Sequence, residues 1–240
     1  MGEEFDPDRR SFLIKMLVAG ALSGTSLMGF VRGGSAMAQR HIVAGMHEVQ
    51  GEVRINGRMA QAGFFVTADD TITTGPKSRA MFVVGKDAFL IRENSHIAFS
   101  GDPTKTLVTA KSSVIKVIRV KFGKILSVFG HAEKRIETTT AICGVRGTGI
   151  YVEADANRTY LCTCYGQVEL QARASSDARE TLKTTHHEAP RYIFAAGSDH
   201  LIIKAPMMNH TDAELIMLEG LVHRHPPFVQ FPSGETSTPY

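Results

Sequence analysis

Two cysteines one residue apart, in the stretch YLCTCYG, have the residue type and spacing best suited to chemistry in this chain. Cys162 and Cys164 are followed downstream by two adjacent histidines, His186 and His187, and then by His210. Thiolates and imidazoles together form tetrahedral sites for borderline or soft transition metals. These five side chains are therefore the candidate ligands of a metal site. Adjacent histidines rarely bind the same ion, so we expect one of the pair to lie at the surface.

The same cysteines admit other interpretations. Side chains two apart on a strand share a face with Cα atoms about 6.5–7 Å apart, so a Cys162–Cys164 disulfide is not expected. Cys143, the third cysteine, could pair with either of them in an oxidising compartment if their strands are neighbours. Otherwise all three are buried thiols in the core. The sequence therefore leaves two possibilities: the protein has no cofactor, or it binds a transition metal.

Among the functional classes considered, the sequence favours an enzyme least. The sequence contains no G-x-S-x-G, H-E-x-x-H or phosphate-loop motif. A nucleophilic pair of Cys164 with His186 or His187 is conceivable, but burial in a strand raises the pKa of a thiol and weakens it as a nucleophile. We therefore expect a non-enzymatic protein.

Composition is that of an ordinary globular protein, with 43% hydrophobic and 21% charged residues among 240. The formal net charge of +3 is only weakly basic. It gives no support to a nucleic-acid partner.

Residues 1–38 have the pattern of an export signal. Arg9 and Arg10 precede Ser-Phe-Leu-Ile-Lys, a glycine- and serine-interrupted apolar stretch follows, and Ala36-Met37-Ala38 ends it. The apolar stretch is too short and too interrupted for a span, which needs about 20 apolar residues. The segment resembles a twin-arginine signal cleaved after Ala38. We expect a periplasmic or secreted protein without a transmembrane segment after cleavage.

The elements that must position the cysteines are short strands. From residue 39 to 175, apolar residues alternate with polar ones and turn residues recur at short intervals, which predicts an all-β domain. Asn56-Gly57 predicts a tight hairpin. Strands are expected over 140–153 and 159–170, and the second of these carries Cys162 and Cys164.

The chain changes character after residue 175. Residues 176–228 are expected to form an extension with one or two strands and one helix. Asn209 or Thr211 can cap the helix, and Leu215, Leu218 and Val222 fall on one of its faces. Residues 229–240 are expected to be a disordered tail.

Three stretches, over 51–84, 123–130 and 138–153, resemble the FecR domain, a periplasmic all-β module of bacterial envelope signalling proteins. The most specific is TTTAICGVRGTGIYVE, whose central motif comprises Gly144, Val145, Arg146, Gly147 and Thr148. The resemblance implies a β-roll or solenoid-like double sheet. In the motif itself, two glycines permit a bend or bulge and Arg146 can donate to free carbonyls there, so we interpret it as a structural brace.

The chain departs from the FecR pattern in two places. Signalling members carry a segment that handles a sigma factor, followed by a membrane span, whereas an export signal stands in that place here. No sigma-factor-binding segment is seen, and we do not carry over the sigma-regulatory role. Cys162 and Cys164 stand where the family has inward-facing apolar residues.

These features predict an exported FecR-domain protein that serves as a non-enzymatic binding or sensing module of the bacterial envelope. Its partner would be an envelope protein or polymer, and the resemblance links it to iron- or metal-related signalling. The alternative is a periplasmic metal- or cofactor-binding protein that uses Cys162, Cys164 and the histidines His186, His187 and His210.

Overall fold

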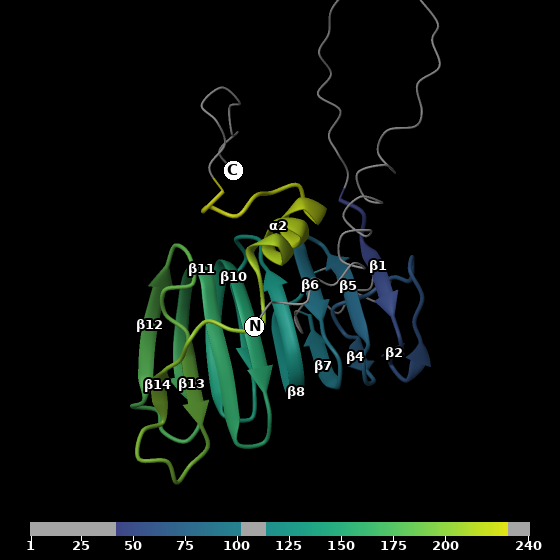
Figure 1. Ribbon diagram of the computed structural model, residues 1–240. Helices are drawn as coiled ribbons and strands as arrows, with labels where there is room; N and C mark the ends of the chain where they lie inside the picture. The colour runs from purple at the N-terminus through teal and green to yellow at the C-terminus, as the bar shows by residue number, and fades with distance from the viewer. Residues whose placement is uncertain (1–41, 102–113, 230–240) are drawn as a thin grey trace, which may run out of the picture. The chain divides into compact units, whose positions relative to one another are not determined.

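The computed structural model describes residues 42–101 and 114–229. Within these ranges the chain forms strands and one C-terminal helix (Figure 1), so the predicted all-β fold with a small helical extension is confirmed. The predicted signal features at Arg9, Arg10 and Ala38 lie outside the described residues.

The strands form one sheet of fourteen members with mainly antiparallel neighbours. The elements are β1 (Gly45–Gln50), β2 (Val53–Ile55), β3 (Arg58–Met59), β4 (Thr71–Thr74), β5 (Arg79–Val84), β6 (Asp87–Ile91), β7 (Ser95–Ser100), β8 (Val117–Val128), β9 (Lys134–Glu137), β10 (Ala141–Ala154), β11 (Arg158–Ala172), β12 (Arg179–Thr184), β13 (Arg191–Phe194), β14 (Ile202–Lys204) and α2 (Asp212–Leu221).

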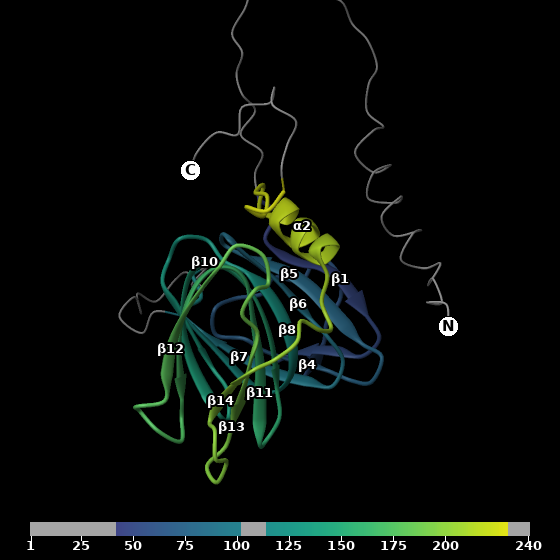
Figure 2. The same cartoon turned by 60° about the vertical axis from the view of Figure 1, so that its left-hand side comes forward.

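The sheet folds over on itself into two layers that share three long strands (Figure 2). The first layer contains β2, β3, β4, β7, β9 and β12, and the second contains β1, β5, β6, β13 and β14. Each of β8, β10 and β11 pairs with first-layer strands along one half and with second-layer strands along the other. Phe99 of the first layer packs edge-on against Phe82 and Phe89 of the second, with ring centroids 5.6 and 5.3 Å apart.

Glycines mark the points where the long strands pass between layers. Gly123 in β8, Gly147 in β10 and Gly166 in β11 have φ values of +104°, +58° and +94°. Residues other than glycine rarely adopt such values. A Cβ on Gly166 would lie 2.9 Å from the carbonyl oxygen of Gly147, so the two strands approach closely there. The bends explain how one continuous sheet encloses a core.

The Gly144–Thr148 motif lies at the bend of β10, as the bulge prediction implies. The register of β10 with β11 shifts between Arg146 and Gly149. The Arg146 Nε atom donates to the carbonyl of His131 at 3.2 Å, and the Thr148 hydroxyl donates to the carbonyls of Arg146 and Gln167 at 2.9 and 3.1 Å. These bonds support the interpretation of the motif as a brace.

The predicted hairpin at Asn56-Gly57 forms, and a second tight turn joins the two long strands expected over 140–153 and 159–170. Asn56 and Gly57 have positive φ values and join β2 to β3 in a two-residue turn. The Asp155 carboxylate accepts from the backbone N–H groups of Asn157 and Arg158, each at 2.8 Å, and closes the turn between β10 and β11. Local turn chemistry therefore sets both pairings.

The two faces of the second layer are buried against different partners. Alternating residues such as Ile150, Val152 and Leu161 point into the central core between the layers. Tyr151 and Cys162 are also buried but lie outside that core cluster, on the opposite face. The C-terminal segment, defined here as residues 205–229, covers this opposite face, and α2 contacts β6 and β8 (Figure 1).

The helix forms where the sequence predicts it. Thr211 is its N-cap, and a reciprocal pair of hydrogen bonds with Glu214 makes a capping box. Leu215, Leu218 and Val222 are buried, as their spacing predicts. Among the described residues, no helix is long and apolar enough to cross a membrane.

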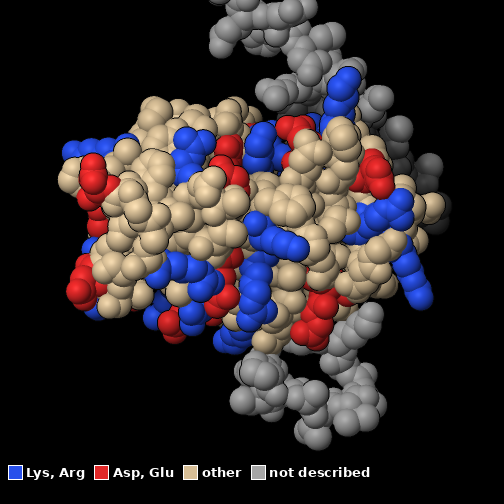
Figure 3. All heavy atoms as spheres, turned by 90° about the horizontal axis from the view of Figure 1, so that it is seen from below, with Lys and Arg blue, Asp and Glu red and all other residues tan. Residues whose placement is uncertain are grey.

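The described surface carries both signs of charge. On the face seen in Figure 3, Lys and Arg side chains lie among Asp and Glu side chains and do not gather into one basic patch. Glu137, for example, pairs with Arg119, Arg135 and Arg173 at 2.9–3.4 Å. Such a mixed surface does not focus a field of one sign.

Candidate metal centre

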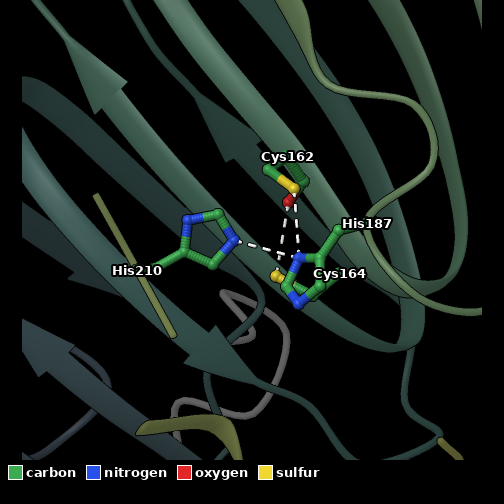
Figure 4. Close-up of side chains that lie close together, drawn as sticks. All are labelled: Cys162, Cys164, His187 and His210. Carbon is green, nitrogen blue, oxygen red and sulfur yellow. Dashed lines mark hydrogen bonds between the residues drawn. The ribbon is translucent and has the colours of Figure 1, made fainter. Parts of the chain in front are cut away.

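Four of the five predicted ligand residues meet in one place (Figure 4). Cys162 and Cys164 point from β11 toward the C-terminal segment. His187 comes from the loop between β12 and β13, and His210 from the residues just before α2. We call these four side chains the buried centre.

The distances in the buried centre are close to those of a tetrahedral ligand set. Cys162 Sγ lies 3.5 Å from His187 Nδ1, and His187 Nδ1 lies 3.1 Å from His210 Nε2. One potential ligand atom from each of the four residues lies within 4.8 Å of all the others. Ligand bonds of about 2.3 Å for sulfur and 2.0–2.1 Å for nitrogen place tetrahedral ligand atoms about 3.3–3.8 Å apart. Small side-chain adjustments would therefore suffice to enclose an ion.

Groups outside the centre hold the other nitrogen of each imidazole. His210 Nδ1 lies 2.7 Å from the carbonyl of Met208, which can only accept, so Nδ1 carries the proton. His187 Nε2 lies 3.0 Å from Oδ1 of Asp212, which likewise accepts. In the neutral rings the lone pairs of His210 Nε2 and His187 Nδ1 then face each other. Oriented imidazoles with carbonyl and carboxylate partners are typical of metal ligands.

The backbone around both histidines is held in unusual conformations. His187 and Asn209, the residue before His210, have φ values of +58° and +61°. The backbone N–H of His187 donates to the carbonyl of Cys164 at 3.0 Å, which ties the loop to β11. The ring of Tyr151 stacks on His210 with centroids 4.6 Å apart. Left-handed conformations are uncommon outside glycine, but Asn and His adopt them more readily than most other residues.

The two thiols have opposite pKa shifts. A hydrogen bond from the Cys164 thiol, with further ones from His187 and His210 when those rings carry a proton on the facing nitrogen, lowers the pKa of Cys162 well below its ordinary value despite burial. Burial raises the pKa of Cys164. Burial also opposes charging of His187, but hydrogen bonds to Cys162 and Asp212 outweigh it, so the His187 pKa is raised. One thiolate is thus favoured within the centre, and a bound cation would favour the second.

Burial indicates a closed centre. Cys162 and Cys164 are 0% exposed as whole residues, and His210 is 4% exposed. Four protein ligands in such surroundings leave no open coordination position for a substrate, which is the pattern of structural zinc sites. The arrangement can hold an ion and join three chain segments.

His186, the fifth predicted ligand, is not part of the buried centre. Its Nε2 atom lies 2.9 Å from Oδ2 of Asp212, and its side chain is 46% exposed. The expectation that one of the adjacent histidines lies at the surface therefore matches the structure. Sequence reasoning missed Asp212 as a partner of both imidazoles. Its place two residues after His210 was the available signal.

Cys143 lies apart from the other two cysteines. Strands β10 and β11 are neighbours, as expected, but their register places Cys143 opposite Leu170 and Tyr151 opposite Cys162. Cys143 points into the central core, where burial raises its pKa to about 12. All three cysteines are free, so the disulfide alternative is wrong. Cys162 and Cys164 do not point into the core between the layers either, which corrects the inward placement suggested by the FecR resemblance.

Comparison with known proteins gives a weak likeness in structure alone. No family model matches the sequence, and no curated protein matches it. Two crystal structures of a candidate anti-sigma factor from Parabacteroides distasonis ATCC 8503, at 1.65 and 2.50 Å resolution, are similar to it with 12% sequence identity and a TM-score of 0.42. The similarity covers 56% of this chain and 58% of that one.

Proposed function

We propose that this chain is a non-enzymatic module of the bacterial envelope that binds one zinc-like ion through Cys162, Cys164, His187 and His210. The observation that carries the proposal is the approach of His187 Nδ1 to His210 Nε2 at 3.1 Å with their opposite nitrogens already engaged. Two lone pairs at this distance repel unless a cation lies between or beside them.

A proton is the simplest competing cation. One proton shared by the two imidazoles would satisfy the 3.1 Å contact, and Cys162 as a thiolate would balance its charge. That arrangement leaves Cys164 as a neutral thiol, which donates to the Cys162 sulfur or, over 3.7 Å, to the carbonyl of Cys162. A metal ion uses all four donor atoms, which favours it over the proton.

The donor set favours zinc over harder ions. Two thiolates and two imidazoles in a tetrahedral arrangement suit Zn²⁺, which imposes no geometry of its own, and sulfur ligands disfavour Mg²⁺ and Ca²⁺. Copper(I) is the main chemical competitor because it also prefers thiolates. Both ions remain colourless in this site, so metal identity has to be measured by elemental analysis.

The envelope setting rests on sequence features. The Arg9-Arg10 signal pattern supports export, and the Gly144–Thr148 motif within its strands supports a FecR-type module. A folded, metal-loaded protein is a suitable cargo for a twin-arginine signal. In this setting the module would bind an envelope protein or polymer, with the ion stabilising the surface that it presents.

Elemental analysis of the exported protein tests the proposal. We expect about one zinc per chain in the natural protein, in keeping with a single four-ligand site, and loss of that zinc in the Cys162→Ser/Cys164→Ser variant. Cys143→Ala is the matched control, because it removes a buried thiol that lies in the central core. Metal far below one equivalent in the natural protein, or equal metal in the double variant, would refute the proposal.

A further inference from the structure

We infer that His186, Asp212 and the outward nitrogen of His187 form a second, outer metal site through which the ion enters the buried centre. The inference rests on the proposed function. It assigns a role to His186, which the buried centre leaves unused.

The geometry of this outer site is that of a small ligand set. His186 Nε2 lies 3.0 and 2.9 Å from the two oxygens of Asp212, and His187 Nε2 lies 3.0 Å from Oδ1 of the same carboxylate. One ligand atom from each of the three residues lies within 4.8 Å of the others. Two imidazole nitrogens and a carboxylate suit a borderline divalent cation such as Zn²⁺.

The outer site is accessible to solvent, whereas the buried centre is not. The side chains of His186 and Asp212 are 46% and 45% exposed, whereas that of His187 is 8% exposed. Three protein ligands leave room for water on the ion, so a hydrated cation can bind without losing its whole shell. A site of this kind holds its ion less tightly than a closed dithiolate site and exchanges it faster.

A single ring connects the two sites. His187 presents Nδ1 to Cys162 and His210, and presents Nε2 to Asp212. Neighbouring contacts hold the loop in place. Glu188 accepts hydrogen bonds from the backbone N–H groups of Thr185 and His186 at 2.8 and 2.9 Å, and Phe228 stacks on His186 with centroids 4.4 Å apart. The ion therefore has a short path across one imidazole.

The transfer balances in bonds and protons. In the outer site the ion binds His187 Nε2, and Nδ1 carries the ring proton. In the buried centre the ion binds Nδ1, which has lost its proton to solvent, while Nε2 has taken one from solvent and donates a hydrogen bond to Asp212. Bonds from the ion to His186, Asp212 and Nε2 break, and bonds to the two sulfurs, Nδ1 and His210 form, while thiol protons leave to solvent. Since Nε2 cannot hold both ion and proton, the sites fill in sequence.

Metal-exchange kinetics of the full-length protein test the inference. Cobalt(II) is the probe, because its thiolate complex absorbs light and reports arrival at Cys162 and Cys164. We expect His186→Ala to slow both association and dissociation by about tenfold, the lower end of what a steering site adds to an association rate, and to leave Kd unchanged. His200→Ala, which removes an exposed imidazole elsewhere, is the matched control.

If His186 lies on the path of the ion, its removal must slow association and dissociation equally, because the ion leaves by the route through which it enters. Unchanged association kinetics in a folded His186→Ala protein would overturn the inference while stoichiometric cobalt binding left the proposed function intact. A change in Kd through dissociation alone would also overturn it, since that marks His186 as a structural support. Failure of the natural protein to bind cobalt at all would remove the proposed function as well.

Discussion

His187 and His210 come from segments on either side of β13 and β14, yet their ring nitrogens Nδ1 and Nε2 lie 3.1 Å apart above β11. The loop that carries His187 is tied to β11 by a backbone hydrogen bond, whereas His210 belongs to the C-terminal segment. An ion held between them would therefore join the segment to the sheet. Metal affinity, amide exchange in the C-terminal segment and the stability of the surrounding fold can each be measured.

Asp212→Ala is expected to weaken zinc affinity by about 10–100-fold, the usual effect of removing a group that orients a ligating histidine. Asp212 does not belong to the buried centre, but it accepts from His187 Nε2 at 3.0 Å and so holds the ring and its tautomer. Competition with a chromophoric chelator gives the affinity. Asp199→Ala, at an exposed carboxylate elsewhere, is the control, and equal affinities in the two variants would contradict the assignment of Asp212.

Removal of the ion is expected to loosen the C-terminal segment. α2 has only ten residues, too few for a stable isolated helix, so it depends on its contacts with the sheet. An ion present at 100 times its Kd adds about 2.7 kcal/mol to the state that binds it. Amide exchange measured with and without a chelator should show lost protection in residues 205–229 and unchanged protection in β4 and β7 of the first layer, since α2 contacts β6 and β8 instead.

The Cys162→Ser/Cys164→Ser variant is the control for that measurement, because the chelator should not change its exchange pattern. Other contacts of the segment, such as the 2.8 Å ion pair between Arg92 and Glu214, do not depend on an ion. If a protein that binds zinc shows the same protection of residues 205–229 with and without it, the ion does not fasten the segment.

Gly123→Ala is expected to destabilise the fold by about 3 kcal/mol or more, through backbone strain together with overpacking. Gly123 has φ +104°, and a Cβ there would overlap the backbone of Ser95. Gly57→Ala is the matched control, since Gly57 has φ +80° with nothing within 4 Å of its Cβ position. The control should lose about 1–2 kcal/mol from strain alone.

Urea unfolding midpoints compare the two variants. Similar losses would show that the β8 bend does not require close approach at Gly123. A larger loss for Gly123→Ala would support the bend as a packing constraint of the fold.

Lys134→Met is expected to cost about 3–5 kcal/mol, because it leaves a buried carboxylate without its counter-ion. Lys134 Nζ lies 3.0 Å from Asp87 Oδ2, with side-chain exposures of 2% and 4%. Lys124→Met is the control. It breaks a 3.4 Å pair with Glu93 whose side chains are 36% and 44% exposed, and such pairs contribute about 0–1 kcal/mol.

The loss in Lys134→Met should depend on pH. Burial raises the pKa of Asp87 in the folded protein, while Lys134 lowers it, so the substitution raises that pKa further. When the pKa of a carboxyl group is higher in the folded than in the unfolded state, the free energy of unfolding falls as pH rises from the unfolded pKa to the folded pKa. Below both pKa values the group is protonated in both states and does not affect stability. The variant should therefore approach the natural protein in stability as pH falls, and a pH-independent difference would contradict this account.

Much of the local structure could be predicted because its causes are local. The two-residue turn at Asn56-Gly57 depends on positive φ values in those residues alone. The N-terminus of α2 depends on Thr211 and Glu214, three residues apart. The strands that carry the cysteines were predicted to within a few residues, since alternation of apolar side chains reports a strand directly.

The centre could be predicted only in part. Period-two alternation shows that Cys162 and Cys164 share a face, but it does not say which face points to the core and which to the C-terminal segment. The strand register, which separates Cys143 from them, depends on the bends at Gly147 and Gly166. A displacement of one residue would reverse every side chain of β11.

The sequence by itself determined the all-β class, the turns, the capped helix and the set of residues able to bind a metal. Only the tertiary structure decided that His187 rather than His186 joins the cysteines, that His210 completes the set and that Asp212 supports it. The reason is physical: turns and caps arise from neighbours in the chain, whereas a four-ligand centre requires three separate segments to meet within a few ångströms, and long-range packing alone sets that meeting.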